Sequence, residues 1–576
     1  MKQLLLGNEA IARGAWEAGC RVASAYPGTP STEITEAIAK YDEIYAEWSP
    51  NEKVALEVGV GASTGGARAI VSMKHVGLNV AADPLFTASY IGVNGGLVIC
   101  VADDPGMHSS QNEQDSRFYA RMSLIPMLEP SDSQECLDYV KFAFELSEEY
   151  DTPVLIRLTT RVAHSRSLVE THERVEAPLK DYSRDVMKRV MMPGMARKRH
   201  VFVEERTQRL ERAAASMPVN RAVHGKGRLG VVAAGICYQY VREALPDADV
   251  FKPGMVWPLP VDAIREFASQ HDKLYVVEDL EPFIEDAIKA AGIPCAGREL
   301  FGVQGEPTAQ LIAEKLAGAP PIPDQASGLP VRPPVLCPGC PHRGIYYVFK
   351  KLGLTVTGDI GCYTLGALAP LETMDTCLCM GASIGMAHGF EKARGRQRKL
   401  VAVIGDSTFI HSGITPLINA VYNQSHITVA ILDNSTTGMT GHQHHPATGK
   451  TLKGADAAVL DLEGLCRSIG VASLAVADPF DTKACEKALK EAQAADGPSV
   501  VIFRRPCALL PGQPKQPRCA VDAAKCRKCK ACMRLGCPAI EDRGDGGIAI
   551  NAALCSGCGL CEGICAFGAI GKEALK

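Results

Sequence analysis

Residues 400–434 read LVAVIGDSTFIHSGITPLINAVYNQSHITVAILDN. The apolar runs at 400–404 and 428–432 predict two buried strands, and the stretch between them predicts a helix that connects them in parallel. Asp406 and Asn434 would then stand at the carboxyl ends of neighbouring strands, where open α/β sheets bind ligands. Mg²⁺ prefers one or two side-chain oxygens together with phosphate oxygens. We therefore predict that Asp406 and Asn434 are magnesium ligands.

The triplet Gly405-Asp406-Ser407, with Asn434 following Asp406 after 28 residues, resembles the thiamine diphosphate motif. The resemblance implies that residues 335–510 form the domain that binds the diphosphate and Mg²⁺, and it adds the backbone carbonyl of Thr436 to the metal ligands. A Gly-Asp-Ser triplet alone would indicate only a strand-to-helix turn. The order strand, triplet, helix, strand, Asp-Asn makes the pattern specific.

Downstream of this motif, Gly438, Met439 and Gly441 precede the run His-Gln-His-His-Pro at 442–446. Three histidines so close together would suit a metal site. No partner ligands stand out, however, so we expect a phosphate or substrate loop beside the cofactor.

Eight of the 22 cysteines fall between residues 526 and 565. Three cysteines at consecutive x2 spacing suit three corners of one Fe4S4 cube, and in bacterial two-cluster ferredoxins the fourth ligand comes from the other half. Zinc sites usually show separated C-x2-C pairs instead. The predicted ligands of one [4Fe-4S] cluster are Cys526, Cys529, Cys532 and Cys565, and those of the other are Cys555, Cys558, Cys561 and Cys537. Two departures from the ferredoxin pattern are the x4 spacing before Cys537 and the alanine after Cys565.

Near the start, the stretch Tyr-Pro-Gly-Thr-Pro-Ser at 26–31 resembles a signature of 2-oxoacid:ferredoxin oxidoreductases. The resemblance implies that Thr29 hydrogen-bonds the substrate carboxylate and that residues 1–165 hold the aminopyrimidine of thiamine diphosphate. Glu52 lies nine residues before Gly61, the start of the segment 61–68, and this spacing matches the family's. The resemblance therefore assigns the activating carboxylate to Glu52, with Glu57 as the rival. The family geometry places His75 and His108 in loops near the active site. Each of them is either a proton-transfer residue or only a polar group with satisfied hydrogen bonds.

Together with the segments 103–108 and 337–344, these motifs resemble the large (alpha) subunit of the indolepyruvate ferredoxin oxidoreductases over nearly the whole chain. That family converts arylpyruvates and coenzyme A to acyl-CoA and reduces ferredoxin. It implies a smaller beta subunit, in an alpha2beta2 heterotetramer. Met439 stands where pyruvate-using relatives carry asparagine, and a thioether either adapts to an aromatic substrate or fills a gap in the core.

Four further cysteines, Cys337, Cys340, Cys362 and Cys507, follow the scatter with which related oxidoreductases hold a cluster near thiamine. The resemblance implies a third [4Fe-4S] cluster. The alternative is one C-x2-C turn and two buried thiols of the core.

The length of 576 residues requires several domains. We expect an α/β protein made of several doubly wound parallel-sheet domains of the thiamine-diphosphate-enzyme type. The expected parts are 1–165, a connecting segment 166–227, a transketolase C-terminal-like domain 228–318, the domain 335–510 and a two-cluster ferredoxin-like domain 515–576. Proline-rich linkers are expected at 319–334 and 511–514, and residues 2–6 are expected to form the first buried strand.

The net charge of -4 gives no argument for nucleic acid, and no apolar run suits a membrane span. We expect a cytoplasmic protein. Three function classes fit the motifs: the oxidoreductase described above, a non-oxidative thiamine diphosphate decarboxylase or synthase with structural clusters, and an electron-transfer protein with a degenerate enzyme domain. Another 2-oxoacid remains open as the substrate.

Overall fold

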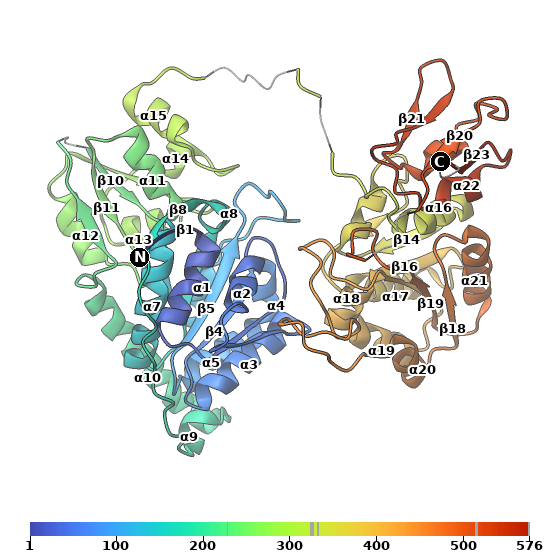
Figure 1. Cartoon of the computed structure of the whole chain (residues 1–576). Helices are drawn as coiled ribbons and strands as arrows, with labels where there is room; N and C mark the ends of the chain where they lie inside the picture. Colours follow the sequence, from blue (N-terminus) through green and yellow to red (C-terminus); the bar gives the residue numbers. More distant parts are fainter. Residues whose placement is uncertain (227–228, 323–327, 331–332, 513–515, 574–576) are drawn as a thin grey trace. The chain divides into compact units, whose positions relative to one another are not determined.

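The computed structural model describes residues 1–226, 229–322, 328–330, 333–512 and 516–573. The chain divides into two compact units, residues 1–327 and 328–576 (Figure 1). Both expected linkers, 319–334 and 511–514, lie partly outside the described residues.

The first unit is built on a seven-stranded sheet whose neighbouring strands are parallel except at one edge. Buried on both faces, its central strands read as continuous apolar runs, as parallel strands do. The order is β12 (Met255–Trp257), β6 (Met127–Leu128), β7 (Val154–Thr159), β5 (Leu97–Asp103), β4 (Ala69–Lys74), β2 (Val22–Ala25) and β3 (Tyr45–Trp48).

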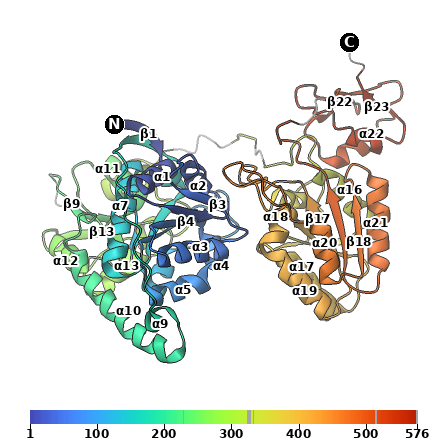
Figure 2. The same ribbon diagram turned by 60° about the horizontal axis from the view of Figure 1, so that its bottom comes forward.

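Helices cover both faces of this sheet (Figure 2). The helices α3 (Glu52–Thr64), α4 (His75–Val80) and α5 (Ala82–Ile91) pack on the face that carries Val71 and Ile99. The helices on the opposite face are α1 (Gly7–Glu17), α2 (Thr32–Ile38) and α7 (Ser133–Tyr150). This arrangement confirms the expected doubly wound α/β architecture.

The expectation of a buried first strand is wrong. Strand β1 (Lys2–Leu6) pairs antiparallel with β8 (Arg166–Glu170) in a separate two-stranded sheet and is partly exposed along its length. Because β1 pairs only with β8 in a two-stranded ribbon, it lacks the second neighbouring strand and the helix-covered faces that bury the strands of the large sheet.

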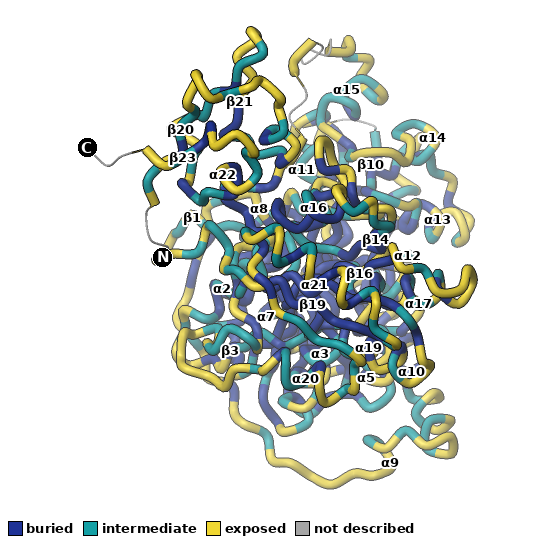
Figure 3. The backbone as a smooth tube through the Cα atoms, turned by 90° about the vertical axis from the view of Figure 1, so that its right-hand side faces the viewer, coloured by how far each residue is buried: buried dark blue, intermediate teal, exposed yellow. Residues whose placement is uncertain are grey.

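The segment 166–227 runs over the surface. It contains α9 (Val186–Arg189) and the long helix α10 (Pro193–Ala214), and the chain around α9 is exposed (Figure 3). Within α10, the buried Arg206 donates hydrogen bonds to the carbonyls of Ser89 and Leu124, which fixes the helix to the first domain.

A four-stranded sheet follows, in the order β13 (Lys273–Val277), β10 (Leu229–Ala233), β11 (Asp249–Lys252) and β9 (Arg221–Val223). Its helices are α11 (Gly235–Ala244), α12 (Val261–Ala268), α13 (Phe283–Ala290), α14 (Arg298–Phe301) and α15 (Ala309–Ala317). Val232 and Val276 belong to the same hydrophobic cluster as Val71 of the large sheet. The two α/β layers of the first unit therefore share one core.

The second unit contains a six-stranded parallel sheet that is also covered on both faces. Val401 and Val403 pack against α16 (His342–Leu352) and α21 (Thr482–Ala494), whereas Ala402 and Ile404 pack against helices of the other face. Those helices are α17 (Ala382–Arg394), α19 (Ile414–Tyr422) and α20 (Leu462–Ile469). The strand order is β15 (Thr376–Cys377), β14 (Thr355–Gly358), β16 (Leu400–Gly405), β17 (Thr428–Asp433), β19 (Ser499–Arg504) and β18 (Ser473–Ala477).

The described C-terminal part contains two short antiparallel strand pairs, one α-helix, a short 3₁₀ helix (Ala531–Leu535) and loops. Strand β20 (Cys519–Val521) pairs with β23 (Ile570–Lys572), and β21 (Ile540–Asp542) pairs with β22 (Ile548–Ile550) beside α22 (Leu560–Ile564). Its small core includes many of the cysteine side chains themselves. None of the helices in the described part of the chain combines the length and apolar character needed to cross a bilayer.

Candidate functional site

Three oxygen-bearing groups meet at the carboxyl ends of β16 and β17. Asp406 directly follows β16, as the first residue of the short helix α18 (Asp406–Thr408), and Asn434 directly follows β17. The Asn434 amide lies 3.3 Å from Asp406 Oδ1 and 2.7 Å from the Thr436 carbonyl oxygen, and it donates to both when its NH₂ group faces them. If the Asn434 amide oxygen faces Asp406 and the Thr436 carbonyl instead, three buried oxygens converge. Mg²⁺ takes such a set of oxygen ligands. The predicted ligands therefore fit this metal.

The Asp406 carboxylate is fixed by its surroundings. The backbone N–H groups of Ser407 and Ser435 donate to its two oxygens over 2.8 and 2.9 Å. His445 Nε2 lies 3.2 Å from Asp406 Oδ2, so one of the three clustered histidines does reach the site. Burial lowers the pKa of His342 to about 4, and the nearby Asp406 opposes this shift.

Glycines allow close packing around these groups. A Cβ atom at Gly405 would lie 2.7 Å from the Tyr363 ring, and one at Gly438 would lie 3.5 Å from Cys362 Sγ and 3.6 Å from Asn434 Nδ2. The Gly438 backbone thus lies beside both the oxygen cluster and a cysteine. Ser407 accepts a hydrogen bond of 2.8 Å from Thr437. Met439 is 52% exposed, so it does not fill a gap in the core of this unit.

In the first unit, Glu52 and its rival Glu57 differ sharply. Glu52 is the first residue of α3 and is 4% exposed, and a Cβ atom at Gly77 would lie 2.6 Å from its Oε1 atom. Only glycine permits this approach of α4 to the carboxylate. Glu57 is exposed and forms an ion pair with Lys53 on the same helix. Of the two, only Glu52 lies in a buried environment.

Thr29 and His75 lie at the carboxyl ends of the adjacent strands β2 and β4. Thr29 is half-buried in the turn between β2 and α2, where a Cβ atom at Gly28 would lie 3.1 Å from Lys74 Cβ. His75 begins helix α4 instead of lying in a loop as predicted. Burial lowers the pKa of His75, and the charge of Asp103 opposes this shift. Burial also lowers the pKa of the neighbouring Lys74, to about 8.

His108 lies in the loop that leaves β5 and is exposed. Its Nε2 atom is 2.8 Å from Glu306 Oε2, and Arg161 binds the same carboxylate over 2.6 Å. The loop is held by Asp104, which accepts hydrogen bonds from Ser110 and Thr160 over 2.6 and 2.7 Å. Burial would raise the pKa of Asp104, but these hydrogen bonds lower it below its usual value. No sequence pattern pointed to Glu306, which lies some 200 residues after His108.

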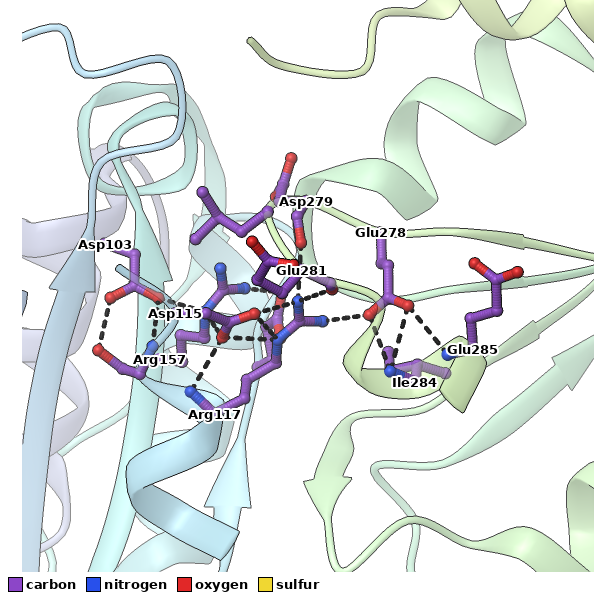
Figure 4. A network of polar contacts seen from close by, with 12 residues as sticks. Asp103, Asp115, Arg117, Arg157, Glu278, Asp279, Glu281, Ile284 and Glu285 are labelled. Atoms are coloured by element: carbon purple, nitrogen blue, oxygen red, sulfur yellow. Dashed lines mark hydrogen bonds and ion pairs between the residues drawn. The ribbon is translucent and has the colours of Figure 1, made fainter. Parts of the chain in front are cut away.

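Buried charged residues support the same loop from below (Figure 4). Asp103, at the end of β5, accepts from Arg157 over 2.7 Å. Arg117 Nη2 donates to Asp115 over 2.6 Å, and its Nη1 donates to Glu278 of the four-stranded domain over 2.6 Å. The network therefore joins the loop to both α/β layers of the first unit.

The four cysteines predicted for the first C-terminal cluster line one cavity. Its walls include Cys526, Cys529, Cys532 and Cys565, together with Arg527, Lys530 and apolar side chains such as Phe567. A cavity bordered by four thiols suits an iron–sulfur cluster. The crossed assignment of Cys565 from the second run to the first group agrees with this arrangement.

The second predicted group also gathers cysteines from both runs. Burial raises the pKa of Cys558, and the neighbouring Cys537 raises it further. Cys555 Sγ accepts hydrogen bonds from the backbone N–H groups of Gly557 and Cys519, over 3.4 and 3.5 Å. The buried Cys519 thiol lies beside Cys561, a neighbour that the C-x2-C pattern did not indicate.

The four scattered cysteines lie near one another as well. Burial, together with the neighbouring Cys507 and Cys337, raises the pKa of Cys362 to about 11. Burial likewise raises the pKa of Cys340 to about 12, with Cys362 and Cys337 among its neighbours. These thiols come from three parts of the sequence, which suits the predicted third cluster better than unrelated core thiols.

Among the described residues, no three His, Cys, Asp or Glu side chains converge as the ligands of one metal ion would. In a cubane each cysteine binds a different iron. Its four ligands therefore surround a volume instead of meeting at a point.

Comparisons with known proteins support both expected thiamine diphosphate domains. Residues 13–222 match the family described as pyruvate flavodoxin/ferredoxin oxidoreductase, thiamine diP-binding. Residues 359–503 match the thiamine pyrophosphate enzyme, C-terminal TPP binding domain. The 2-oxoglutarate synthase subunit KorA of Methanocaldococcus jannaschii is 30% identical over 185 residues, which cover 30% of this chain and 50% of that protein.

Several relatives match this chain along nearly the full length of both. The indolepyruvate oxidoreductase subunit IorA of Archaeoglobus fulgidus is 41% identical over 98% of this chain and 96% of its own. The subunit IorA of Pyrococcus horikoshii is 40% identical over 99% of this chain and 97% of its own. With thiamine diphosphate domains in both units, this chain belongs to the indolepyruvate ferredoxin oxidoreductase family, as its large (alpha) subunit.

Proposed function

We propose that this oxidoreductase carries out the thiamine-diphosphate-dependent oxidative decarboxylation of arylpyruvates, with indolepyruvate as the favoured substrate. The products are the arylacetyl-CoA and CO₂, and the electrons leave through [4Fe-4S] clusters to ferredoxin. The observation that carries the proposal is the convergence of Asp406, Asn434 and the Thr436 carbonyl beside Cys362. Oxygen atoms suited to Mg²⁺ thus lie next to one of the predicted cluster cysteines within the same unit.

The resemblance of both domains to thiamine diphosphate enzymes assigns separate roles to residues of each. Asp406, Asn434 and the Thr436 carbonyl would hold Mg²⁺ and through it the diphosphate, and Gly405, Ser407 and Gly438 would line the turn beside these ligands. Glu52 would hydrogen-bond the aminopyrimidine, a role for which its burial in a low-dielectric environment is suited. When bound, thiamine diphosphate supplies the carbanion chemistry that decarboxylates 2-oxoacids.

The remaining predicted residues would act on the substrate. The Thr29 hydroxyl donates to the substrate carboxylate. His75, whose pKa is lowered by burial, stays neutral at physiological pH and can accept a proton. His108, oriented by Glu306, serves as a second proton-transfer group. The exposed thioether of Met439 offers a polarizable surface for an aromatic ring.

The relatives are named as subunits, which supports a partner for this chain. We infer a smaller beta subunit in an alpha2beta2 assembly that supplies the coenzyme A site. The tail clusters, on the cysteine groups described above, would pass electrons to ferredoxin one at a time.

The test is an anaerobic substrate panel on the purified two-subunit enzyme. Indolepyruvate, phenylpyruvate and pyruvate are compared with coenzyme A and a viologen dye. We expect dye reduction with the highest kcat/KM for indolepyruvate. A preference for pyruvate would refute the arylpyruvate assignment, and CO₂ release without dye reduction would instead identify a non-oxidative decarboxylase.

A further inference from the structure

The buried side chain of Arg343, in the first turn of α16, bridges two loops that carry cysteines. It is 2% exposed. Its Nε atom donates to the Cys337 carbonyl over 3.1 Å and its Nη2 atom donates to the Leu336 carbonyl. Its Nη1 atom donates to the carbonyls of Leu535, over 3.0 Å, and Gly536. One guanidinium thus joins the start of the thiamine domain to the C-terminal part, immediately before Cys537.

The two cysteine loops also touch each other directly. Gly339, between Cys337 and Cys340, has a positive φ of 74°. A Cβ atom there would lie 2.4 Å from the Oγ atom of Ser556, which stands between Cys555 and Cys558. A side chain at position 339 would therefore push the loops apart.

Among the residues that the structure describes, the Arg343 guanidinium forms no ion pair with a carboxylate. In the described part of the chain, its hydrogen bonds go to backbone carbonyls. The thiols whose charge acts on its guanidinium belong to both loops: Cys537, Cys340, Cys337 and Cys558. A guanidinium stays protonated in proteins, and a buried cation is costly without an anion nearby. Thiolate-bound clusters on both sides would supply that negative charge.

We propose that Arg343 is a positioning residue that links the cluster of Cys337, Cys340, Cys362 and Cys507 to the cluster of Cys537, Cys555, Cys558 and Cys561, and that raises the reduction potential of both. This inference rests on the cluster assignments of the proposed function. The physical reason is that a fixed positive charge in a poorly screened environment stabilises the added electron on either cluster. The same contacts hold the two clusters adjacent for electron transfer.

The test compares Arg343→Gln and Arg343→Lys in the full-length chain purified with its partner subunit. Arg534→Gln is the matched control, because it removes the same charge from an exposed position beside the same loop, where water screens it. Cluster potentials are measured by redox titration with electron paramagnetic resonance, without substrate. Iron content is determined for each variant.

In Arg343→Gln we expect at least a tenfold shift of the reduction equilibrium toward the oxidised state, about 59 mV for one electron, at two clusters. The cluster of Cys526, Cys529, Cys532 and Cys565 should keep its potential. Arg343→Lys keeps the charge, so it should show less than half of this shift, and Arg534→Gln should show none.

Unchanged potentials in an Arg343→Gln protein with full iron content would overturn the proposal, as would equal shifts in all clusters. If Arg343→Gln loses iron, the Arg343→Lys protein decides the question. A shift of its two cluster potentials by the full amount expected for loss of the charge, about 59 mV, would overturn the proposal. Failure of the proposed function would appear separately, as absent thiamine-dependent turnover in the unmodified enzyme.

Discussion

At the scale of single residues, burial separates groups that look alike in sequence. Glu52 and Glu57 are five positions apart on α3, yet only Glu52 is enclosed, with Gly77 of α4 packed against its carboxylate. A carboxylate that acts on a cofactor must be held in place and shielded from water, whereas an exposed one paired with Lys53 is screened. We therefore keep Glu52 as the proposed activating residue.

Replacing Glu52 with Gln should reduce kcat about 10²- to 10⁴-fold, because the amide cannot accept the proton that a carboxylate accepts. Steady-state rates of indolepyruvate-dependent viologen reduction measure the effect. The control Glu57→Gln has the same change of charge on the same helix and should retain full activity. Comparable losses in both variants would argue against the assignment.

At the scale of elements, the loop after β5 depends on the charged network beneath it. Asp103, Asp115, Glu129, Glu278 and Asp279 are carboxylates packed around two guanidinium groups, those of Arg117 and Arg157. Carboxylates outnumber cations, so not all of them can ionise cheaply. Burial raises the pKa of Glu278 from 4.5 to about 7 and that of Asp279 from 3.8 to about 6.

These raised values set a direction for the pH dependence of stability. A carboxyl group with a higher pKa in the folded state binds its proton more tightly when folded. Its stabilising contribution is complete below the unfolded pKa, near 4, and is lost as the pH rises through 6 to 7. Hydrogen exchange in β5 and β13 should therefore show weaker protection at pH 8 than at pH 5, after correction for the intrinsic rate.

In Glu278→Gln the side chain is neutral at every pH. The variant should therefore avoid up to about 3 kcal/mol of the stability that the unsubstituted protein loses as the pH rises, at roughly 1.4 kcal/mol per pKa unit. The exposed substitution Glu57→Gln should leave the pH dependence unchanged. A Glu278→Gln protein whose protection still falls as steeply would show that this carboxyl group is ionised throughout.

At the scale of the whole molecule, cysteines from distant segments gather into three groups. Cys362 and Cys507 are neighbours although 145 residues separate them, and they come from loops at the carboxyl edge of the six-stranded sheet. Parallel strands bring their following loops to one edge, so the sheet topology collects these thiols.

Iron analysis tests the third group. With four irons per cubane, we expect about twelve irons per chain in the anaerobically purified protein and about eight in Cys340→Ser. Cys466→Ser is the control, because Cys466 is buried in the core below the same sheet and belongs to none of the groups. About eight irons in the unsubstituted chain would remove the third cluster.

The sequence alone was sufficient for features that depend on local order. Apolar runs predicted the strands β16 and β17, and the triplet at 405–407 predicted the turn at Asp406. The close spacing of the tail cysteines indicated which of them belong to one loop. These signals are local because strand burial, turn geometry and C-x2-C loops are encoded by adjacent residues. The doubly wound architecture followed from them.

Only the tertiary structure decided which distant residues meet. It placed β1 outside the large sheet, enclosed Glu52 but not Glu57, and brought Glu306 to His108. It also set Arg343 between two cysteine loops. Such contacts join segments as far as 198 residues apart, and their energies depend on burial and on charges from other elements. No local pattern in one sequence carries that information.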